Sequence, residues 1–275
     1  MKKIIASALF VFYLLSTAEA QKGWEAGAWV GGSYYFGDLN TNFDLSLPGP
    51  AGGVIARYNF NERVSLKFSG NYGLMRGDDA LSENTFERAR NLSFRSHVIE
   101  LSPVLEFNFL PYVHGSELEW FSPYVFAGFN IAYFNPQAHL NEEWIDLRPL
   151  GTEGQMRGEE YASFTGGLVY GLGFKFDLSY DWSVNIELGA RQLFTDYLDD
   201  VSTTYPDFDQ LRDTRGDLAV ILSDRSESIP GSVVAPIGAF GRQRGNSTTK
   251  DSYVLFGVGL VYYFGSLPCP ETSIR

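Results

Sequence analysis

Charged residues of both signs recur at alternate positions within the apolar stretches of this chain. Because strand side chains point alternately to the two faces, such residues would share one side of a sheet. Carboxylates and cations gathered away from water must pair, and the loss of one partner is costly. The pattern predicts a buried ion-pair network; a path for protons or ions is the alternative. The residues on this face are Arg57, Lys67, Glu100, Glu106, Lys175, Asp177, Glu187 and Arg191.

The histidines and serines offer little for metal binding or catalysis. His97, His114 and His139 fall in three different predicted segments, so they are not expected to converge on one metal ion. Ser and Asp are plentiful, but the Gly-x-Ser-x-Gly elbow of the α/β-hydrolases is absent. We therefore predict a non-enzymatic protein with no cofactor and no metal. If lipid turnover did occur, His97 at the outer rim would be the best candidate base.

Aspartates cluster in the segment that follows Phe194. Oxygen ligands suit hard cations, yet the Asp-x-Asp-x-Asp-Gly spacing of a calcium loop is missing. We interpret the cluster as part of a solvated loop. The alternatives are a divalent or lipopolysaccharide-bridging role, and contacts with Arg191, Arg212 or Arg215 that fold the loop. The cluster comprises Asp196, Asp199, Asp200, Asp207 and Asp209.

A period-two alternation of apolar residues supplies the scaffold for these side chains. An apolar row facing lipid and a polar row facing the interior are typical of a membrane barrel. The sequence therefore predicts an all-β fold, an up-and-down antiparallel transmembrane barrel of eight strands, OmpA-like in size. Such an interior is just wide enough for side chains to fill, so a general pore is not expected. The alternating segments are about 24–37, 51–60, 64–74, 93–109, 122–133, 161–177, 182–194 and 251–264.

Pro103 is the discordant residue of the fourth segment. Proline cannot donate a hydrogen bond to a strand ladder and is usually confined to edges or bulges. We therefore expect a local bulge or a shift of register at this position.

The chain ends carry their own signals. Residues 1–20 contain Lys2 and Lys3, an apolar run and a small-x-small site before Gln21, which predicts a cleaved secretory signal peptide. Residues 21–264 would form the barrel, and 265–275 a periplasmic tail. Cys269 is the only cysteine, so an intramolecular disulfide is impossible. The net charge of −12 argues against nucleic acid as a partner.

The lengths of the connections predict which way the barrel faces. Residues 61–63 form a tight connection, and barrels of this type keep short turns on the periplasmic side and long loops outside. We therefore expect an outer-membrane barrel with both termini in the periplasm. The long external loops would be 38–50, 76–92, 135–160 and 197–250.

Five stretches stand out as motifs: residues 34–40 (YYFGDLN), 89–94 (ARNLSF), 106–112 (EFNFLPY), 195–202 (TDYLDDVS) and 250–253 (KDSY). Together they resemble the PorG family of outer-membrane barrels. The resemblance covers nearly the whole mature chain. It implies a component of the type IX secretion system of Bacteroidota that is associated with a periplasmic ring of a lipoprotein and its partner. In some members this machine also supports gliding motility.

The expected partners are membrane lipids, lipopolysaccharide and the periplasmic ring proteins. The alternative is an independent structural or surface-binding barrel that acts through its long external loops. On the first interpretation, the candidate partner surface at the periplasmic end is Asn61, Glu62, Arg63, Tyr112, His114, Glu117, Glu119 and Trp120.

Overall fold

The computed structural model describes residues 22–226 and 237–265. The predicted signal peptide at 1–20 lies outside the described residues, as does nearly all of the predicted tail, including Cys269. The boundaries proposed for these two segments therefore stay predictions.

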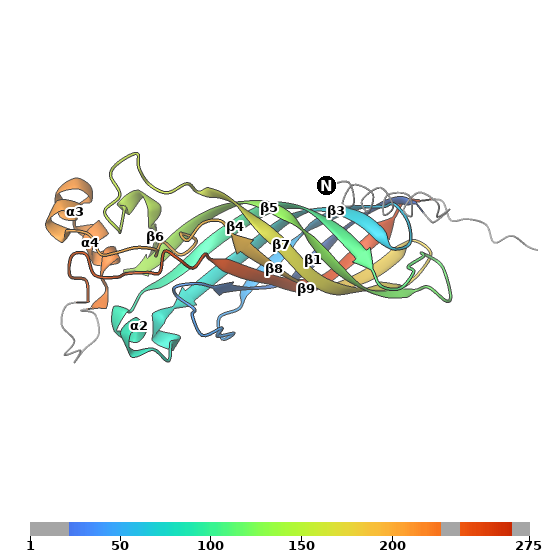
Figure 1. The fold of residues 1–275 in the computed structure, drawn as a ribbon, viewed down its shortest axis with the longest axis horizontal. Coiled ribbons are helices and arrows are strands. Elements are labelled where there is room, and N and C mark those ends of the chain that lie inside the picture. The colour runs from blue at the N-terminus through green and yellow to red at the C-terminus, as the bar shows by residue number, and fades with distance from the viewer. Residues whose placement is uncertain (1–21, 227–236, 266–275) are drawn as a thin grey trace, which may run out of the picture.

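Eight long antiparallel strands close into a barrel, which confirms the predicted fold class (Figure 1). Each strand pairs with its neighbours along the chain, and β1 closes the ring by pairing with β9. A ninth, short strand, β6, pairs with an extension of β5. The strands are β1 (Gly23–Phe36), β2 (Gly49–Asn59), β3 (Val64–Asp78), β4 (Ser93–Asn108), β5 (Phe121–Leu140), β6 (Glu143–Asp146), β7 (Phe164–Asp177), β8 (Trp182–Leu193) and β9 (Ser252–Tyr263).

The alternation along each strand places apolar side chains outside and polar side chains inside. On β4, Leu101 is 67% exposed whereas the adjacent Glu100 is 1% exposed. Ile131 on the neighbouring strand repeats the outward pattern, at 67% exposure. In a water-soluble barrel these outward rows would be a large unfavourable apolar surface, but in a bilayer they face lipid.

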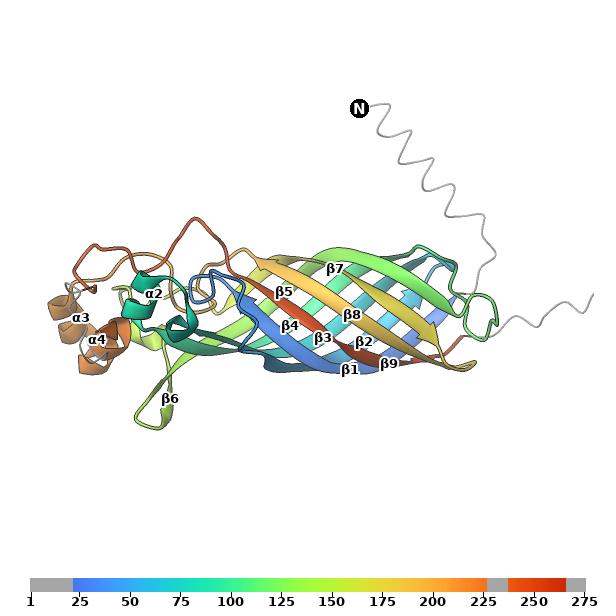
Figure 2. The same cartoon turned by 90° about the horizontal axis from the view of Figure 1, so that it is seen from below.

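The two ends of the barrel differ in the length of their connections. The turn end consists of connections 60–63, 109–120 and 178–181, together with the described chain ends near Gly23 and Phe264. The cap end carries connections 37–48, 79–92, 141–163 and the described parts of 194–251. Figures 1 and 2 show that α3, α4 and α2 all gather at the cap end. We call the structure formed there the cap.

Pro103 does not produce the predicted bulge or register shift. The β4–β5 ladder lapses at Ser102 and Pro103, but the register is the same on both sides of the gap. On the β3 side the pairing continues through Phe68 and Pro103. The missing N–H of Pro103 therefore interrupts the β4–β5 pairing only briefly. The register is maintained because β4 remains paired with β3 at this position.

The predicted external loops contain more regular structure than their polar composition suggested. β5 was expected to end near Tyr133 but continues to Leu140, where it forms a hairpin with β6. The loop expected at 197–250 contains two helices, and the side chain of Asp207 caps the first of them by accepting from the backbone N–H groups of Asp209 and Gln210. These elements could not be predicted from the sequence because each is too short to show a clear apolar periodicity. The cap helices are η1 (Asp79–Leu81), α2 (Thr85–Arg90), η2 (Arg148–Leu150), α3 (Phe208–Arg215) and α4 (Asp217–Ser223).

Within residues 22–226 and 237–265, no helix has the length and apolar character needed to cross a membrane.

Candidate functional site

The interior of the barrel is organised around Glu106 on β4. Its carboxylate lies 2.8 Å from Nε of Arg57 and 2.7 Å from Nζ of Lys175. Nζ of Lys67 lies 3.2 Å away. Arg57 in turn contacts the carboxylate of Glu25 at 2.5 Å. These side chains come from β1, β2, β3, β4 and β7, so the network ties opposite walls of the barrel together.

A second group of pairs continues the network toward the cap end. Arg191 Nη2 lies 3.0 Å from the carboxylate of Glu100. The amide groups of Asn71 and Asn130 also donate to Glu100, at 2.8 and 2.7 Å. Between the two groups, Lys67 contacts Glu187 at 2.5 Å. Buried carboxylates are tolerable because each of them receives several charge-assisted hydrogen bonds.

All eight residues of the predicted lumen set take part in ion pairs of this network. The structure adds two charged members that the alternation did not single out, Glu25 and His114. Glu25 does have the correct parity on β1, but the glycines of that strand obscure the alternation. A cavity of about 20 Å³ remains beside Lys67 and Glu187, which is room for about one water molecule. The interior is thus a packed polar core.

The turn-end connection 109–120 folds back into the mouth of the barrel. The two ring nitrogens of His114 lie 3.0 Å from Glu25 and 2.8 Å from Asp177. Both nitrogens face carboxylates, so both must donate, and only the imidazolium form can do so. Burial opposes the charge, but the hydrogen bonds with Asp177 and Glu25 raise the pKa of His114 above its ordinary value. The ring also stacks on Tyr263 at 4.4 Å between centroids.

This folding changes which residues of the predicted partner surface are accessible. Asn61, Tyr112 and His114 are buried, so these three side chains do not form part of an exposed surface. Their polar groups suggested that these side chains would be exposed to solvent. In the structure, polar groups at the mouth of the barrel surround them instead, such as Glu25 and Asp177 around His114. Leu118, which was not predicted, is 92% exposed at the tip of the connection. The accessible members of the predicted set are Arg63, Glu117 and Trp120, with Glu62 and Glu119 half-buried.

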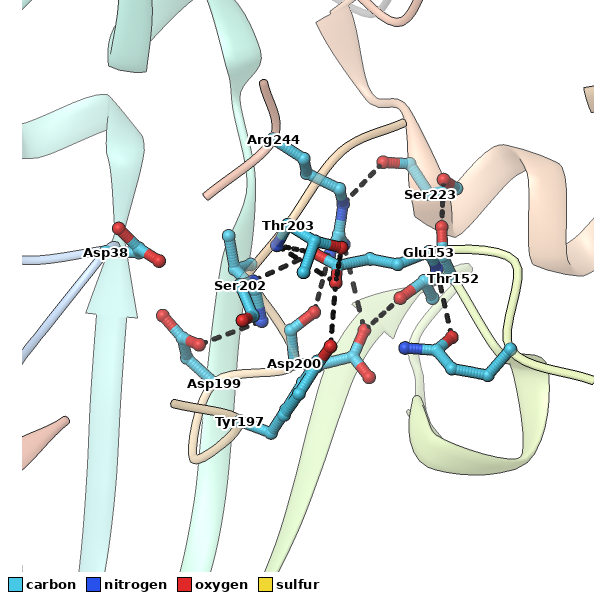
Figure 3. A network of polar contacts seen from close by, with 12 residues as sticks. Asp38, Thr152, Glu153, Tyr197, Asp199, Asp200, Ser202, Thr203, Ser223 and Arg244 are labelled. Atoms are coloured by element: carbon cyan, nitrogen blue, oxygen red, sulfur yellow. Dashed lines mark hydrogen bonds and ion pairs between the residues drawn. The ribbon is translucent and has the colours of Figure 1, made fainter. Parts of the chain in front are cut away.

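The cap contains an ion-pair network of its own, centred on Arg244 (Figure 3). Its Nη1 lies 3.1 Å from the carboxylate of Glu153, and its Nη2 lies 3.7 Å from that of Asp200. Asp200 also accepts from the hydroxyl groups of Thr152 and Tyr161, at 2.5 and 2.6 Å. Burial raises the pKa of Asp200 to about 6, against the opposing charge of Arg244.

Two further carboxylates meet at Tyr35, where the cap joins the barrel. The Tyr35 hydroxyl oxygen lies 2.5 Å from Asp199 Oδ2 and 3.0 Å from Asp251 Oδ1. One phenolic proton can satisfy only one of these contacts, so the other requires a proton on a carboxyl group. Burial raises the pKa of both Asp199 and Asp251 well above the ordinary range, and the nearby charge of Asp38 adds to the effect. We call these three side chains, Tyr35, Asp199 and Asp251, the proton clasp.

The aspartate cluster is therefore only partly solvated. Asp196, Asp199 and Asp200 are buried, contrary to the predicted solvated loop, because the segment packs beneath the rest of the cap. Burial raises the pKa of Asp196 to about 7. The buried Asp200 pairs with Arg244, which was not among the candidates, while the predicted Arg215 ties the loop to Glu160. Asp209 is exposed and pairs with Arg212 at 2.9 Å.

The histidines lie apart, as the topology predicted for them. His97 Nδ1 lies 2.8 Å from the hydroxyl oxygen of Tyr72 on the outer wall, and His139 packs beside Trp144 in the β5–β6 hairpin. Within the part of the chain that the structure describes, no group of His, Cys, Asp and Glu side chains is arranged to hold a metal ion.

Residues 2–218 match the profile of a family described as a domain of unknown function, DUF6089. The chain belongs to this family. A search of curated proteins finds no significant match.

Solved barrel structures align with most of this DUF6089 chain at low identity. The N-terminal β-barrel domain of OprF from Pseudomonas aeruginosa is 11% identical, with a TM-score of 0.39, and the alignment covers 90% of this chain and 100% of that one. Neisserial surface protein A is also 11% identical, with a TM-score of 0.42 and the same coverage. The outer-membrane protein OprG from Pseudomonas aeruginosa is 11% identical, with a TM-score of 0.41 and coverage of 90% and 98%.

Proposed function

We propose that this DUF6089 barrel is a non-enzymatic outer-membrane component of a type IX secretion machine. Its turn end would face the periplasm and anchor a ring formed by a lipoprotein and its partner. The resemblance to the PorG family suggests this role, and the packed interior supports it. A barrel whose interior is filled by ion pairs leaves no channel for solutes, so we place its function at its two ends.

The observation that carries the proposal is the form of the turn-end connection 109–120. Its inner half is fixed in the barrel mouth by His114, while Glu117 and Leu118 project from it. A connection that is anchored in the barrel mouth presents this exposed leucine to a partner with little loss of conformational entropy. The neighbouring Trp120 and Arg63 extend this accessible surface.

The proposal is tested by affinity purification from native outer membranes in mild detergent, followed by mass spectrometry. We expect the unmodified barrel to retain the ring lipoprotein and its partner. Leu118→Glu and Glu117→Lys should release them while the barrel remains folded. Asp209→Lys, an exposed charge change at the cap end, is the matched control. Retention of the ring by both turn-end variants would contradict the proposal.

A second candidate function is surface recognition by the cap, and a specific observation favours it. The cap is folded around the buried ion pairs of Arg244 with Glu153 and Asp200. Loops that only connect strands in solvent do not need such a buried core. It also exposes Phe240 and Phe43, each more than 70% accessible. On this alternative, Phe240→Ser should abolish binding of a surface partner, and the turn-end variants should be silent.

A further inference from the structure

Two arginines lie side by side on the outer wall of the barrel near the cap end. Arg76 on β3 and Arg95 on β4 are register partners. Both point outward, because the flanking Met75 and Phe94 are buried inside. Like charges directly opposite each other destabilise a strand pair. Among the described residues no carboxylate forms an ion pair with either guanidinium, so the pair lacks the counterion that would offset this repulsion.

The pair lies at the level where lipid headgroups are expected. Along β4 the outward row runs from Ile99 through His97 to Arg95. On β3 it runs from the exposed Tyr72, past the covered Leu74, to the exposed Arg76. Each row thus passes from the apolar belt, or from an aromatic position at its edge, to a cation as it approaches the cap. This is the order of hydrocarbon, interface and headgroup layer across a membrane.

The guanidinium group of Arg95 is held in one orientation by its neighbours. The centre of its guanidinium lies 3.8 Å from the centroid of the Trp144 ring, and its Nε donates to Gln137 Oε1 at 2.9 Å. Among residues 22–226 and 237–265, the contacts of this guanidinium are the stacking on one face and the hydrogen bond at Nε, which leave its two terminal nitrogens available. A pre-ordered guanidinium loses little entropy when it binds, and its planar fork matches an oxyanion such as phosphate.

A cleft of about 340 Å³ opens beside Arg76, between β1, β3 and the connections 37–48 and 79–92. Its lining combines the aromatic ring of Tyr34 and the amide of Asn42 with the carboxylates Asp44, Asp78 and Glu83. Carboxylates in this cleft would repel a phosphate but would accept hydrogen bonds from hydroxyl or amide groups. Phosphate therefore fits the arginine pair, and an uncharged sugar ring fits the adjacent cleft.

We propose that Arg76, Arg95 and this cleft bind the phosphorylated sugar headgroup of a lipid, namely the lipid A part of lipopolysaccharide. The phosphate bridges the two guanidinium groups through charge-assisted hydrogen bonds. The sugar to which it is attached occupies the cleft. The choice of lipid A rests on the proposed orientation, which places the cap end outside.

The test is a titration of the full barrel in detergent with lipid A, read by native mass spectrometry. Arg76→Gln and Arg95→Gln should each weaken binding by about tenfold, the effect of losing one hydrogen bond between charged groups. Lys22→Gln removes an exposed cation at the opposite end and should leave affinity unchanged. Dephosphorylated lipid A should bind the unmodified barrel as weakly as the double arginine variant binds lipid A.

Equal affinity in the two arginine variants and Lys22→Gln would overturn the site. Binding of phosphatidylglycerol as tight as that of lipid A would retain the phosphate contact but overturn the sugar assignment. Maleimide labelling of Phe240→Cys on intact cells checks the orientation separately. Because the arginines are remote from the turn end, ring retention by the arginine variants distinguishes failure here from failure of the proposed function.

Discussion

The barrel interior and the cap both bury carboxylates, but they neutralise them in different ways. In the interior, five carboxylates face four permanent cations and the imidazolium of His114, so the charges balance. At the proton clasp, Asp199 and Asp251 share a tyrosine, while the guanidinium groups of Arg90 and Arg244 in the same cap pair with other carboxylates. The interior carboxylates are Glu25, Glu100, Glu106, Asp177 and Glu187, and the permanent cations are Arg57, Lys67, Lys175 and Arg191.

The interior of the barrel is thus stabilised by ion pairs, whereas the junction between the cap and the barrel is stabilised by a bound proton. Removing one interior charge should therefore affect the whole barrel. A change of pH should act first on the cap, where a proton substitutes for a missing cation.

The largest effect is expected for Glu106→Gln. This substitution keeps the shape of the side chain but leaves Arg57, Lys67 and Lys175 without their common carboxylate. Breaking a buried ion pair in this way costs about 3–5 kcal/mol. Urea unfolding in detergent micelles measures the loss of unfolding free energy. Glu119→Gln, on the turn-end surface, is the control; a similar small change in both variants would mean that the interior charges are not held as pairs.

Arg244→Met should open the cap and leave the barrel intact. It removes the cation from the buried Glu153 and Asp200, a loss of about 3 kcal/mol that is confined to the cap contacts. Hydrogen exchange should rise in residues 196–226 and 237–251, while the strands stay protected. If the strands exchange faster too, the cap and the barrel unfold as one unit and the comparison fails.

The proton clasp should make the cap weaker as the pH rises. Carboxyl groups whose pKa is raised in the folded state stabilise it below their unfolded pKa, and the contribution disappears as the pH passes the folded pKa. Burial raises the pKa of Asp196 to about 7 and of Asp38 to about 6, in the same direction as for Asp199 and Asp251. Proteolysis of the cap should therefore accelerate between about pH 5 and about pH 8.

Asp251→Asn sharpens this prediction. The asparagine amide can donate to the Tyr35 oxygen without an added proton, so the pH dependence should flatten while the cap stays closed. Asp209→Asn, an exposed change in the same connection, should keep the original profile. A cap that loosens at every pH in Asp251→Asn would show that the carboxyl group itself, and not a shared proton, holds the junction.

The smallest effect is expected at His114. Its pKa is raised in the folded state by Asp177 and Glu25, so its contribution is full below the unfolded pKa and is lost as the pH rises through the folded value. His114→Gln should remove this part of the pH dependence at a cost of about 1 kcal/mol. The cost is small for an interior charge because Glu25 keeps its contact with Arg57 and Asp177 keeps the hydrogen bond from the backbone N–H of Gly115. Hydrogen exchange of residues 110–120 reads out the change, and unaltered exchange would assign the anchoring of the connection to Tyr112 instead.

The interior charges could be predicted from the sequence because strand alternation is a local property. Lys67 lies between Leu66 and Phe68, and that spacing alone assigns it to the inner face. His114 could not be predicted in this way. It lies in a connection, where no periodicity applies, and only the closed barrel brings Glu25 and Asp177 to its two nitrogens.

The cap shows the same limit more strongly. Arg244, Glu153 and Asp200 are separated by tens of residues in a polar part of the chain, and their pairing leaves no repeating pattern. Asp199 and Asp200 look solvated because acidic residues in loops usually are. Their burial depends on the packing of the connection beneath the rest of the cap.

The sequence by itself determined the number of barrel strands, their inward and outward faces and the charged character of the interior, because all three follow from a period of two along the chain. The tertiary structure alone decided which charges pair, which connection enters the barrel mouth and where a proton replaces a cation. These outcomes depend on distances between residues that are remote in sequence, and those distances exist only after the barrel has closed.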